Sequence, residues 1–154
     1  MFRINQKTDE KNITAAIGLF REYAAWLGVD LGFQGFEKEL SLIGKMYAPP
    51  HGALFVVYEN DEAVGCLGLR KIDNGVGELK RMYLKEAYRN QGLGKMLLDE
   101  ALERARSLGY LKVRLDTLDS MIPAMRFYEK NGFVKIPPYY HNPIEGAVYF
   151  EMNI

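Results

Sequence analysis

The chain has 154 residues, a length that suits one domain, residues 1–154, built around a single hydrophobic core. Hydrophobic residues make up 48% of the sequence and charged residues 26%, an ordinary balance for a globular protein. Lysine and arginine number 20, as do aspartate and glutamate, so the formal net charge is zero. A general nucleic-acid binder has a basic excess, and we therefore expect no nucleic-acid partner.

Cysteine usage and hydropathy indicate the compartment. Cys66 is the single cysteine, so no intramolecular disulfide can form, as is usual in a reducing compartment. The first residues lack the apolar run of a signal peptide, and no stretch approaches the ~18 consecutive apolar residues of a membrane span. We therefore expect a cytoplasmic protein without a membrane partner.

The first half of the chain begins with a short strand at residues 2–5. Apolar residues at spacings of three and four then predict a helix that ends at Leu27, beside Gly28. A shorter helix is expected over residues 36–46, before a pair of prolines. The period then changes, and strands are expected at residues 53–58, 63–69 and 76–84, the first two as an antiparallel hairpin.

The second half alternates helices with strands. Helices are expected at residues 93–108 and from a cap at Asp119 or Ser120 through Lys130, which accepts Pro123 in its first turn. Further strands are expected at residues 111–115, 133–136 and 147–152. Mixed strands with helices between them predict an α/β fold of the α+β mixed-sheet kind, in three layers.

A glycine-rich loop joins the strand at 76–84 to the helix that follows it. The pattern Arg89-x-x-Gly92-x-Gly94 places glycines where a helix N-terminus leaves backbone N–H groups without partners, an arrangement that favours a bound phosphate. A Walker loop is excluded because Met96 stands where Ser or Thr is needed, and a dinucleotide fingerprint because Leu97 replaces its third small residue. A purely structural turn is the alternative.

Two segments in this order resemble the GNAT family of N-acetyltransferases. Residues 78–84, followed by Arg-x-x-Gly-x-Gly at 89–94, resemble the cofactor motif of the family. Residues 124–133 resemble its later Ala-x-x-x-Tyr-x-x-x-Gly-Phe segment. The resemblance runs from about residue 53 to the end of the chain. It implies the family fold, a mostly antiparallel twisted sheet flanked by helices, and direct transfer of an acetyl group from acetyl-CoA to a primary amine.

The resemblance also implies where acetyl-CoA binds. The pantetheine arm would lie along the backbone of Met82 and Leu84, and the pyrophosphate on the amides of the loop, which Arg89 would anchor. Met121 stands where many relatives carry Asn, so one polar contact to the cofactor is missing. The implied cofactor-binding residues are Met82, Tyr83, Leu84, Arg89, Asn90, Gln91, Gly92, Leu93, Gly94 and Lys95.

Tyr128 occupies the position that the family uses for its general acid. The sulfur of the acetyl thioester leaves as a thiolate, and a phenol held nearby can supply the proton that it needs. An aromatic packing residue on an amphipathic helix is the alternative interpretation of Tyr128.

Glu78 is the candidate base, because many family members place an acidic residue on this strand. An amine must be neutral to attack, and an alkyl ammonium has a pKa of ~10.4 in water, so a carboxylate in a cleft can accept its proton. A salt bridge to Lys80 or Arg81 is the alternative role. Asp116 and Asp119 are weaker candidates for the base.

The acceptor amine would lie against an aromatic segment, residues 137–147, which three prolines stiffen, and against the region of the first two helices. Arg70 could pair with a carboxylate of the substrate. Phe36 and Tyr47 could also line the pocket for the acceptor amine. The expected acceptor-binding residues are Trp26, Phe33, Arg70, Tyr139 and Tyr140.

Three functions stay open on the sequence alone. A small molecule is the expected acceptor, and a protein acceptor, at an N-terminal amine or lysine, and a non-catalytic acetyl-CoA-binding module are the alternatives. His51 and His141 are the only histidines, so we expect no metal site. A homodimer would form through the last strands.

Overall fold

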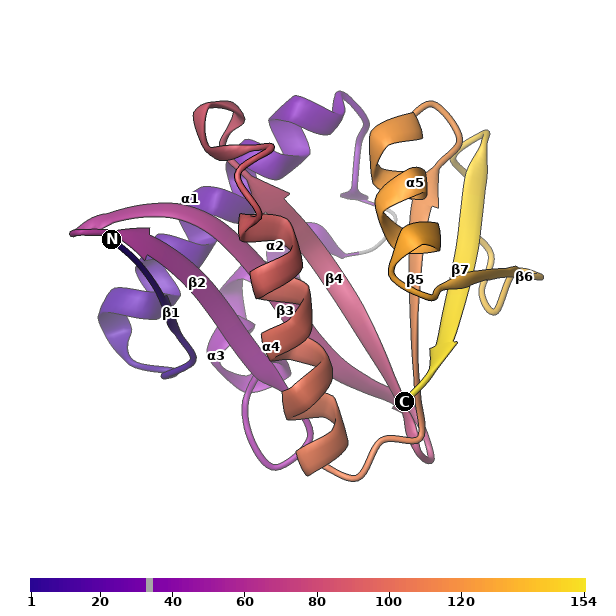
Figure 1. Cartoon of the computed structure of the whole chain (residues 1–154), viewed down its shortest axis with the longest axis horizontal. Helices are drawn as coiled ribbons and strands as arrows, with labels where there is room; N and C mark the ends of the chain where they lie inside the picture. The colour runs from indigo at the N-terminus through magenta and orange to yellow at the C-terminus, as the bar shows by residue number, and fades with distance from the viewer. Residues whose placement is uncertain (33–34) are drawn as a thin grey trace.

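The computed structural model describes residues 1–32 and 35–154, and its centre is a seven-stranded sheet in the order β1-β2-β3-β4-β5-β7-β6 (Figure 1). Neighbouring strands are antiparallel except β4 and β5, which run parallel. The strands are β1 (Phe2–Asn5), β2 (Ala53–Glu59), β3 (Glu62–Asp73), β4 (Val76–Leu84), β5 (Lys112–Leu118), β6 (Val134–Ile136) and β7 (Ala147–Asn153). The expected mixed, mostly antiparallel sheet is confirmed.

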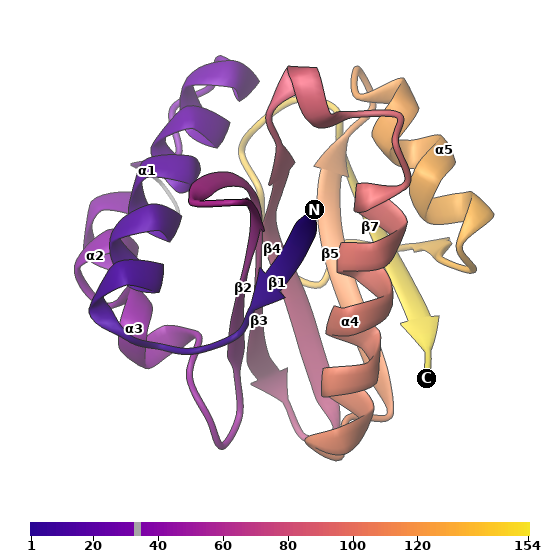
Figure 2. The ribbon, with the colours of Figure 1, turned by 60° about the vertical axis from the view of Figure 1, so that its left-hand side comes forward.

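Helices cover both faces of this sheet, which gives the expected three layers (Figure 2). One face carries α1 (Glu10–Leu27), α2 (Phe36–Ser41) and α3 (Ile43–Met46). The other carries α4 (Leu93–Ser107) and α5 (Ile122–Lys130), and a short 3₁₀ helix, η2 (Glu86–Tyr88), lies between β4 and α4. Among the described residues, none of the helices has the length and apolar character that crossing a membrane requires.

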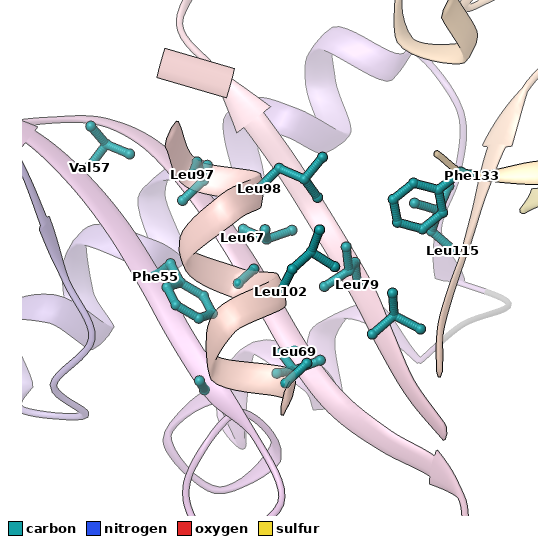
Figure 3. Packing of buried hydrophobic residues seen from close by; sticks show 14 of the residues in the cluster. Phe55, Val57, Leu67, Leu69, Leu79, Leu97, Leu98, Leu102, Leu115 and Phe133 are labelled. Atoms are coloured by element: carbon teal, nitrogen blue, oxygen red, sulfur yellow. The ribbon is translucent and has the colours of Figure 1, made fainter. Parts of the chain in front are cut away.

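The sheet separates two hydrophobic clusters, because successive side chains of a strand point to opposite faces. Phe55 and Val57 of β2 face α4 and join the larger cluster, in which Leu97 and other α4 residues pack on the strands (Figure 3). Leu54 and Val56 face α1 and join the smaller cluster. Both faces of β2 are therefore buried, which explains its unbroken apolar sequence.

Local polar chemistry fixes both ends of α1, and its end at Leu27 is where the sequence predicted it. The Asp9 side chain accepts a hydrogen bond from the Asn12 backbone N–H at 2.9 Å and caps the helix. Gly28 ends the helix in the left-handed conformation, with φ 72°, and its N–H donates to the Ala24 carbonyl.

Two expected helix details were wrong. Residues 36–46 form two helices rather than one, with a break at Leu42, where the Leu42 N–H donates to Glu39 in a tighter turn and the Ser41 hydroxyl bonds the Lys38 carbonyl. Met121, not Asp119 or Ser120, is the N-cap of α5, and its side chain makes no capping bond. The Asp119 N–H instead donates to the Gly146 carbonyl, which ties the start of α5 to the loop before β7.

The sheet opens between its two parallel strands. β4 and β5 pair through Val76–Glu78 and residues 112–114, and beyond these residues the strands diverge (Figure 1). On the other edge of β4 a bulge interrupts the pairing with β3, and Arg81 adopts φ 60° within it. This opening, together with the start of α4, positions the candidate site.

Candidate active site

A cavity of about 100 Å³ lies in the opening between β4 and β5. Its walls come from the end of α1, from β4 and β5, from α5, and from the loop between β6 and β7. Helices α1 and α5 cover opposite faces of the sheet (Figure 2). Because both helices line the cavity, the cavity extends through the sheet between β4 and β5.

The first turn of α4 has the backbone features of an anion-binding site. Gly92 is its N-cap, with φ 82°, and the first backbone bond of the helix runs from the Met96 N–H to the Gly92 carbonyl at 3.1 Å. The backbone N–H groups of residues 93–95 therefore have no partner within the helix, and the helix dipole adds positive potential there. A phosphate fits this arrangement.

Gly94 differs from Gly92 in what the fold requires of it. Its backbone is not left-handed, and a Cβ added to it would lie 3.6 Å from the Phe127 ring, an ordinary contact. The fold therefore has room for a side chain at this position, whereas Gly92 is required by its φ of 82°. Close packing inside the protein therefore does not require glycine at position 94.

Arg89, at the start of the loop, bonds back to the end of β4. Its Nε donates to the Leu84 carbonyl at 2.8 Å, and its guanidinium lies 4.6 Å from the centre of the Trp26 ring and 5.6 Å from that of Tyr83. The Leu84 carbonyl, which was expected to meet the pantetheine arm, thus already has a protein partner. Lys95, at the rim, pairs with Asp99 at 2.9 Å on the surface.

Tyr128 lies in the cavity wall contributed by α5, opposite β4. Its ring packs against the aromatic rings of Phe127, Phe133 and Phe150, and its hydroxyl lies 3.6 Å from the Met82 sulfur. Burial raises the pKa of Tyr128 well above its ordinary value, so its phenol keeps its proton at neutral pH. The ring of Tyr128 is thus a packing residue, which was the alternative interpretation of the sequence. Tyr128 also lines the cavity, so the structure is compatible with both roles.

Glu78 is almost completely buried and has two close partners. The Arg70 Nε lies 2.8 Å from one carboxylate oxygen, and the Tyr139 hydroxyl donates to the other at 2.6 Å. Lys80 lies 4.0 Å away. Neither Glu78 nor Arg70 is among the described residues that line the cavity. The structure therefore brings Glu78, Arg70 and Tyr139 together, with Arg70 in place of the expected Lys80 or Arg81 as the principal salt-bridge partner.

Arg81, in the bulge of β4, forms a second buried pair. Its guanidinium bonds both Glu39 carboxylate oxygens, at 2.9 and 3.1 Å, and lies 5.3 Å from the Phe36 ring. The Tyr47 hydroxyl donates to Glu39 at 2.9 Å. Burial alone would raise the pKa of Glu39, but the Arg81 hydrogen bonds and charge outweigh it and lower that pKa. Phe36 and Tyr47 thus support the ion pair and are not part of the cavity wall.

Asp116 of β5 is a carboxylate that does line the cavity. The Tyr140 hydroxyl and the Asn142 amide, the latter at 3.0 Å, both donate to its Oδ2. Tyr140 and Tyr139 pack with Tyr149 at ring-centre distances of 5.3 to 5.5 Å. The loop between β6 and β7 therefore connects to β4 through Tyr139 and to β5 through Tyr140.

The other expected acceptor residues are distributed unevenly. Trp26 lines the cavity and is 46% exposed. Phe33 lies outside the described residues. Sequence reasoning missed Lys80 and Asn142, which both line the cavity. The two-residue period of β4 could have indicated Lys80, because it shares a strand face with Glu78. Within residues 1–32 and 35–154, His, Cys, Asp and Glu side chains form no group of three that could hold a metal ion.

A helix N-terminus that suits phosphate and a cavity lined by a protonated tyrosine are compatible with a transferase that uses an acylated coenzyme. Comparison with known proteins identifies the group. Residues 16–133 match the model of the acetyltransferase (GNAT) family. An uncharacterised N-acetyltransferase of Schizosaccharomyces pombe is 38% identical over 88% of this chain and 85% of its own length. The chain therefore belongs to the GNAT family, and it is an acetyl-CoA-dependent N-acetyltransferase.

Solved structures agree with this assignment. A GNAT acetyltransferase from Staphylococcus aureus superposes with a TM-score of 0.84 over 99% of each chain at 24% identity, which shows the shared fold. A GNAT acetyltransferase from Elizabethkingia anophelis, solved with acetyl-CoA bound, is 26% identical with a TM-score of 0.60 over 74% of this chain and 82% of its own. GNAT relatives of this fold thus bind acetyl-CoA.

Proposed function

We propose that this enzyme moves the acetyl group of acetyl-CoA directly onto the primary amine of a small molecule, with residues 1–154 as one cytoplasmic catalytic domain. The observation that carries the proposal is the cavity of about 100 Å³ that Tyr128 and the charged residues of β4 and β5 line. A cavity that is narrow and lined by both polar and apolar side chains suits a small acceptor better than a polymer. The buried thiol of Cys66 supports a reducing compartment.

The residues around α4 suit acetyl-CoA, which supplies the acetyl group as a thioester whose sulfur leaves as a thiolate. The backbone N–H groups of residues 91–95 would hold its pyrophosphate, and Arg89 and Asn90 would shape that loop. Met82, which lines the opening where β5 no longer pairs with β4, would contact the pantetheine arm through its backbone. Tyr83 and Leu84 would complete this wall of the site.

Tyr128 would give its proton to the leaving thiolate. The position of its hydroxyl at the cavity, near Met82, supports this role. Burial raises the pKa of Tyr128, and the same low-polarity surroundings raise the pKa of a thiol formed beside it, so the proton transfer stays feasible.

The acceptor ammonium must lose a proton before its nitrogen attacks, and a carboxylate at the cavity can accept that proton. Asp116 lines the cavity, and its Oδ2 is oriented by Tyr140 and Asn142. Glu78, the candidate from the sequence, is held by Arg70 and Tyr139 instead. We therefore assign proton acceptance to Asp116 and keep Glu78 as the alternative.

Variants of the two carboxylates separate these roles. We expect Asp116→Asn to lower kcat/KM by about 10²-fold at neutral pH, with partial recovery as rising pH deprotonates the amine. Glu78→Gln should cause a smaller loss that does not depend on pH. The measurement is a pH profile of thiol release for each variant. The opposite pattern would return the role of base to Glu78.

Calorimetric titration with acetyl-CoA, with ATP and NAD as controls, tests the proposed function first. Selective binding of acetyl-CoA, followed by thiol release with a panel of small amines, is the expected result. Thiol release with peptides alone would establish a protein acceptor. Firm binding without turnover of any amine or peptide would establish a non-catalytic module.

A further inference from the structure

The loop before α4 depends on support from outside itself. Asn90 and Gly92 both adopt left-handed backbone conformations, with φ 62° and 82°. A left-handed residue other than glycine persists where the surrounding structure enforces it. Within the loop, the Gln91 amide donates to the Ala87 carbonyl at 3.0 Å, in an exposed position. The side chain of Arg89, the residue before Asn90, supplies contacts from outside the loop.

Arg89 is held at two points along its side chain. Its Nε donates to the Leu84 carbonyl at 2.8 Å. Its guanidinium lies 4.6 Å from the centre of the Trp26 ring and 5.6 Å from that of Tyr83. Both distances are within the range of a cation–π contact, which is roughly 6 Å. An arginine side chain has many rotamers in water, so these contacts reduce the freedom that it would otherwise lose when a ligand binds.

Trp26 is itself fixed by aromatic neighbours. It lies in the last turn of α1, and its ring centre is 5.8 Å from that of Tyr83 and 6.4 Å from that of Tyr23. The rings of Tyr23 and Tyr83 are 6.2 Å apart. Tyr83 is buried in the smaller hydrophobic cluster, between α1 and the sheet. These three rings, which we call the aromatic triad, therefore connect the end of α1 to Arg89.

Packing in the core does not account for Trp26. Its side chain is 46% exposed, whereas Tyr83 beside it is buried. Trp26 lines the cavity and also contacts Arg89. An aromatic ring suits both neighbours, because its face attracts a guanidinium and its edge contacts other rings. The contact with Arg89 therefore gives Trp26 a second place in the site, besides the acceptor pocket that the sequence indicates.

We propose that Trp26 is a positioning residue for acetyl-CoA, because its ring holds the Arg89 guanidinium and so keeps the loop in the shape that binds the pyrophosphate. This inference rests on the proposed function and adds a residue of α1 to the cofactor half of the site. A site that is arranged before its ligand arrives loses less conformational entropy on binding. Affinity for the coenzyme therefore depends on a ring that lies more than 60 residues before the loop in the sequence.

Calorimetric titration of the complete enzyme with coenzyme A tests this role. No acceptor is present, so a contact of Trp26 with the amine cannot contribute. We expect Trp26→Leu to raise the Kd about fivefold, as loss of an exposed cation–π contact would. Trp26→Phe keeps a ring and should restore most of the affinity. Phe36→Leu removes a ring that lies 5.3 Å from a different arginine, Arg81, and as the matched control it should bind like wild type.

A double-mutant cycle shows whether Trp26 acts through Arg89. In the background of Arg89→Met, Trp26→Leu should change the Kd for coenzyme A little, because the group that the ring holds is already absent. Additive losses would overturn the positioning role. Denaturant unfolding, followed by circular dichroism, separates this role from a general loss of structure. An affinity loss that parallels a loss of stability in both Trp26→Leu and Phe36→Leu would also overturn the inference.

Trp26 is the only tryptophan of the chain, so its fluorescence reports the contact directly. Acrylamide should quench this fluorescence more strongly in Arg89→Met than in wild type, because the guanidinium covers part of the ring. Equal quenching would overturn the inference. If the wild-type enzyme binds neither coenzyme A nor acetyl-CoA, the proposed function itself fails. Binding that is equally tight in wild type and Trp26→Leu removes the inference alone.

Discussion

The two halves of the proposed site, one for the phosphates of the cofactor and one for the amine, are built in different ways. The phosphate half comes from one continuous stretch, from Leu84 to Lys95, and it uses backbone N–H groups that the start of α4 leaves without partners. The amine half comes from α1, β4, β5 and the loop at residues 137–146, and it uses side chains held by one another. A site made of backbone can be recognised from a short local pattern, whereas a site made of side chains depends on the whole fold.

Removal of the Tyr128 hydroxyl tests the point where the two halves meet and should have the largest effect. We expect Tyr128→Phe to lower kcat by about 10²-fold or more, because general acid catalysis contributes that much. Affinity for acetyl-CoA, measured by calorimetry, should hardly change, since the ring still packs against Phe133 and Phe150.

Tyr110→Phe is the matched control for this hydroxyl, because the Tyr110 phenol bonds the His51 carbonyl and does not line the cavity among the described residues. It should leave kcat unchanged. Wild-type turnover in Tyr128→Phe would leave Tyr128 as a packing residue and place the acid elsewhere.

Substitution of Glu39, the buried partner of Arg81, tests how much the structure around the amine half depends on this ion pair. We expect Glu39→Gln to lower the free energy of unfolding by about 3–5 kcal/mol, because it leaves the Arg81 charge buried without its partner. Denaturant unfolding measures the loss. Glu37→Gln, on the same helix but at an exposed pair with Arg21, should cost about 0–1 kcal/mol.

The same pair predicts a pH dependence. The pKa of Glu39 is lower in the folded protein than its ordinary value of 4.5, so its contribution to stability is complete above about pH 4.5. It is lost as the pH falls further, through the folded-state pKa. Wild type should therefore lose stability below pH 4.5 more steeply than Glu39→Gln, and parallel unfolding curves for the two proteins would contradict the assignment.

Gly92→Ala tests the phosphate half and should have a smaller effect on the fold than Glu39→Gln. A side chain at φ 82° costs about 1–2 kcal/mol, although nothing lies within 4 Å of the added Cβ. Gly109→Ala, at φ 90° after the other end of α4 and with equal space, should cost the same. Calorimetry should show weaker acetyl-CoA binding for Gly92→Ala alone; equal affinities would remove this loop from the cofactor site.

Local signals predicted most of the fold. The strand at 76–84, the end of α1 at Gly28 and the loop before α4 follow from periodicity and glycine, and the structure has them as expected. The break at Leu42 and the uncapped start of α5 were missed, because a tighter turn and a contact to Gly146 decide them. Tertiary contacts of this kind leave no local pattern.

The amine half shows the same limit more strongly. The sequence indicated Glu78, Arg70 and Tyr139 as site residues but not that they bind one another. Cross-strand register places Arg70 opposite Glu78, and that register depends on the hairpin between β3 and β4. The sequence did not single out Lys80 or Asn142 as site residues, although Lys80 lies within the motif at residues 78–84. Their place in the cavity follows from the bulge at Arg81 and from the loop that Tyr140 ties to Asp116.

The opening between β4 and β5 also has a mechanical consequence. Three residue pairs join these strands, so the ladder that connects β1–β4 to β5–β7 is the shortest central connection in the sheet, and side-chain packing supplies the rest of the cohesion. A ligand bound in the opening would contact both parts of the sheet and would hold them together. At a concentration 100 times its Kd, such a ligand adds about 2.7 kcal/mol of stability, and amide hydrogen exchange in β5 and β7 should slow accordingly.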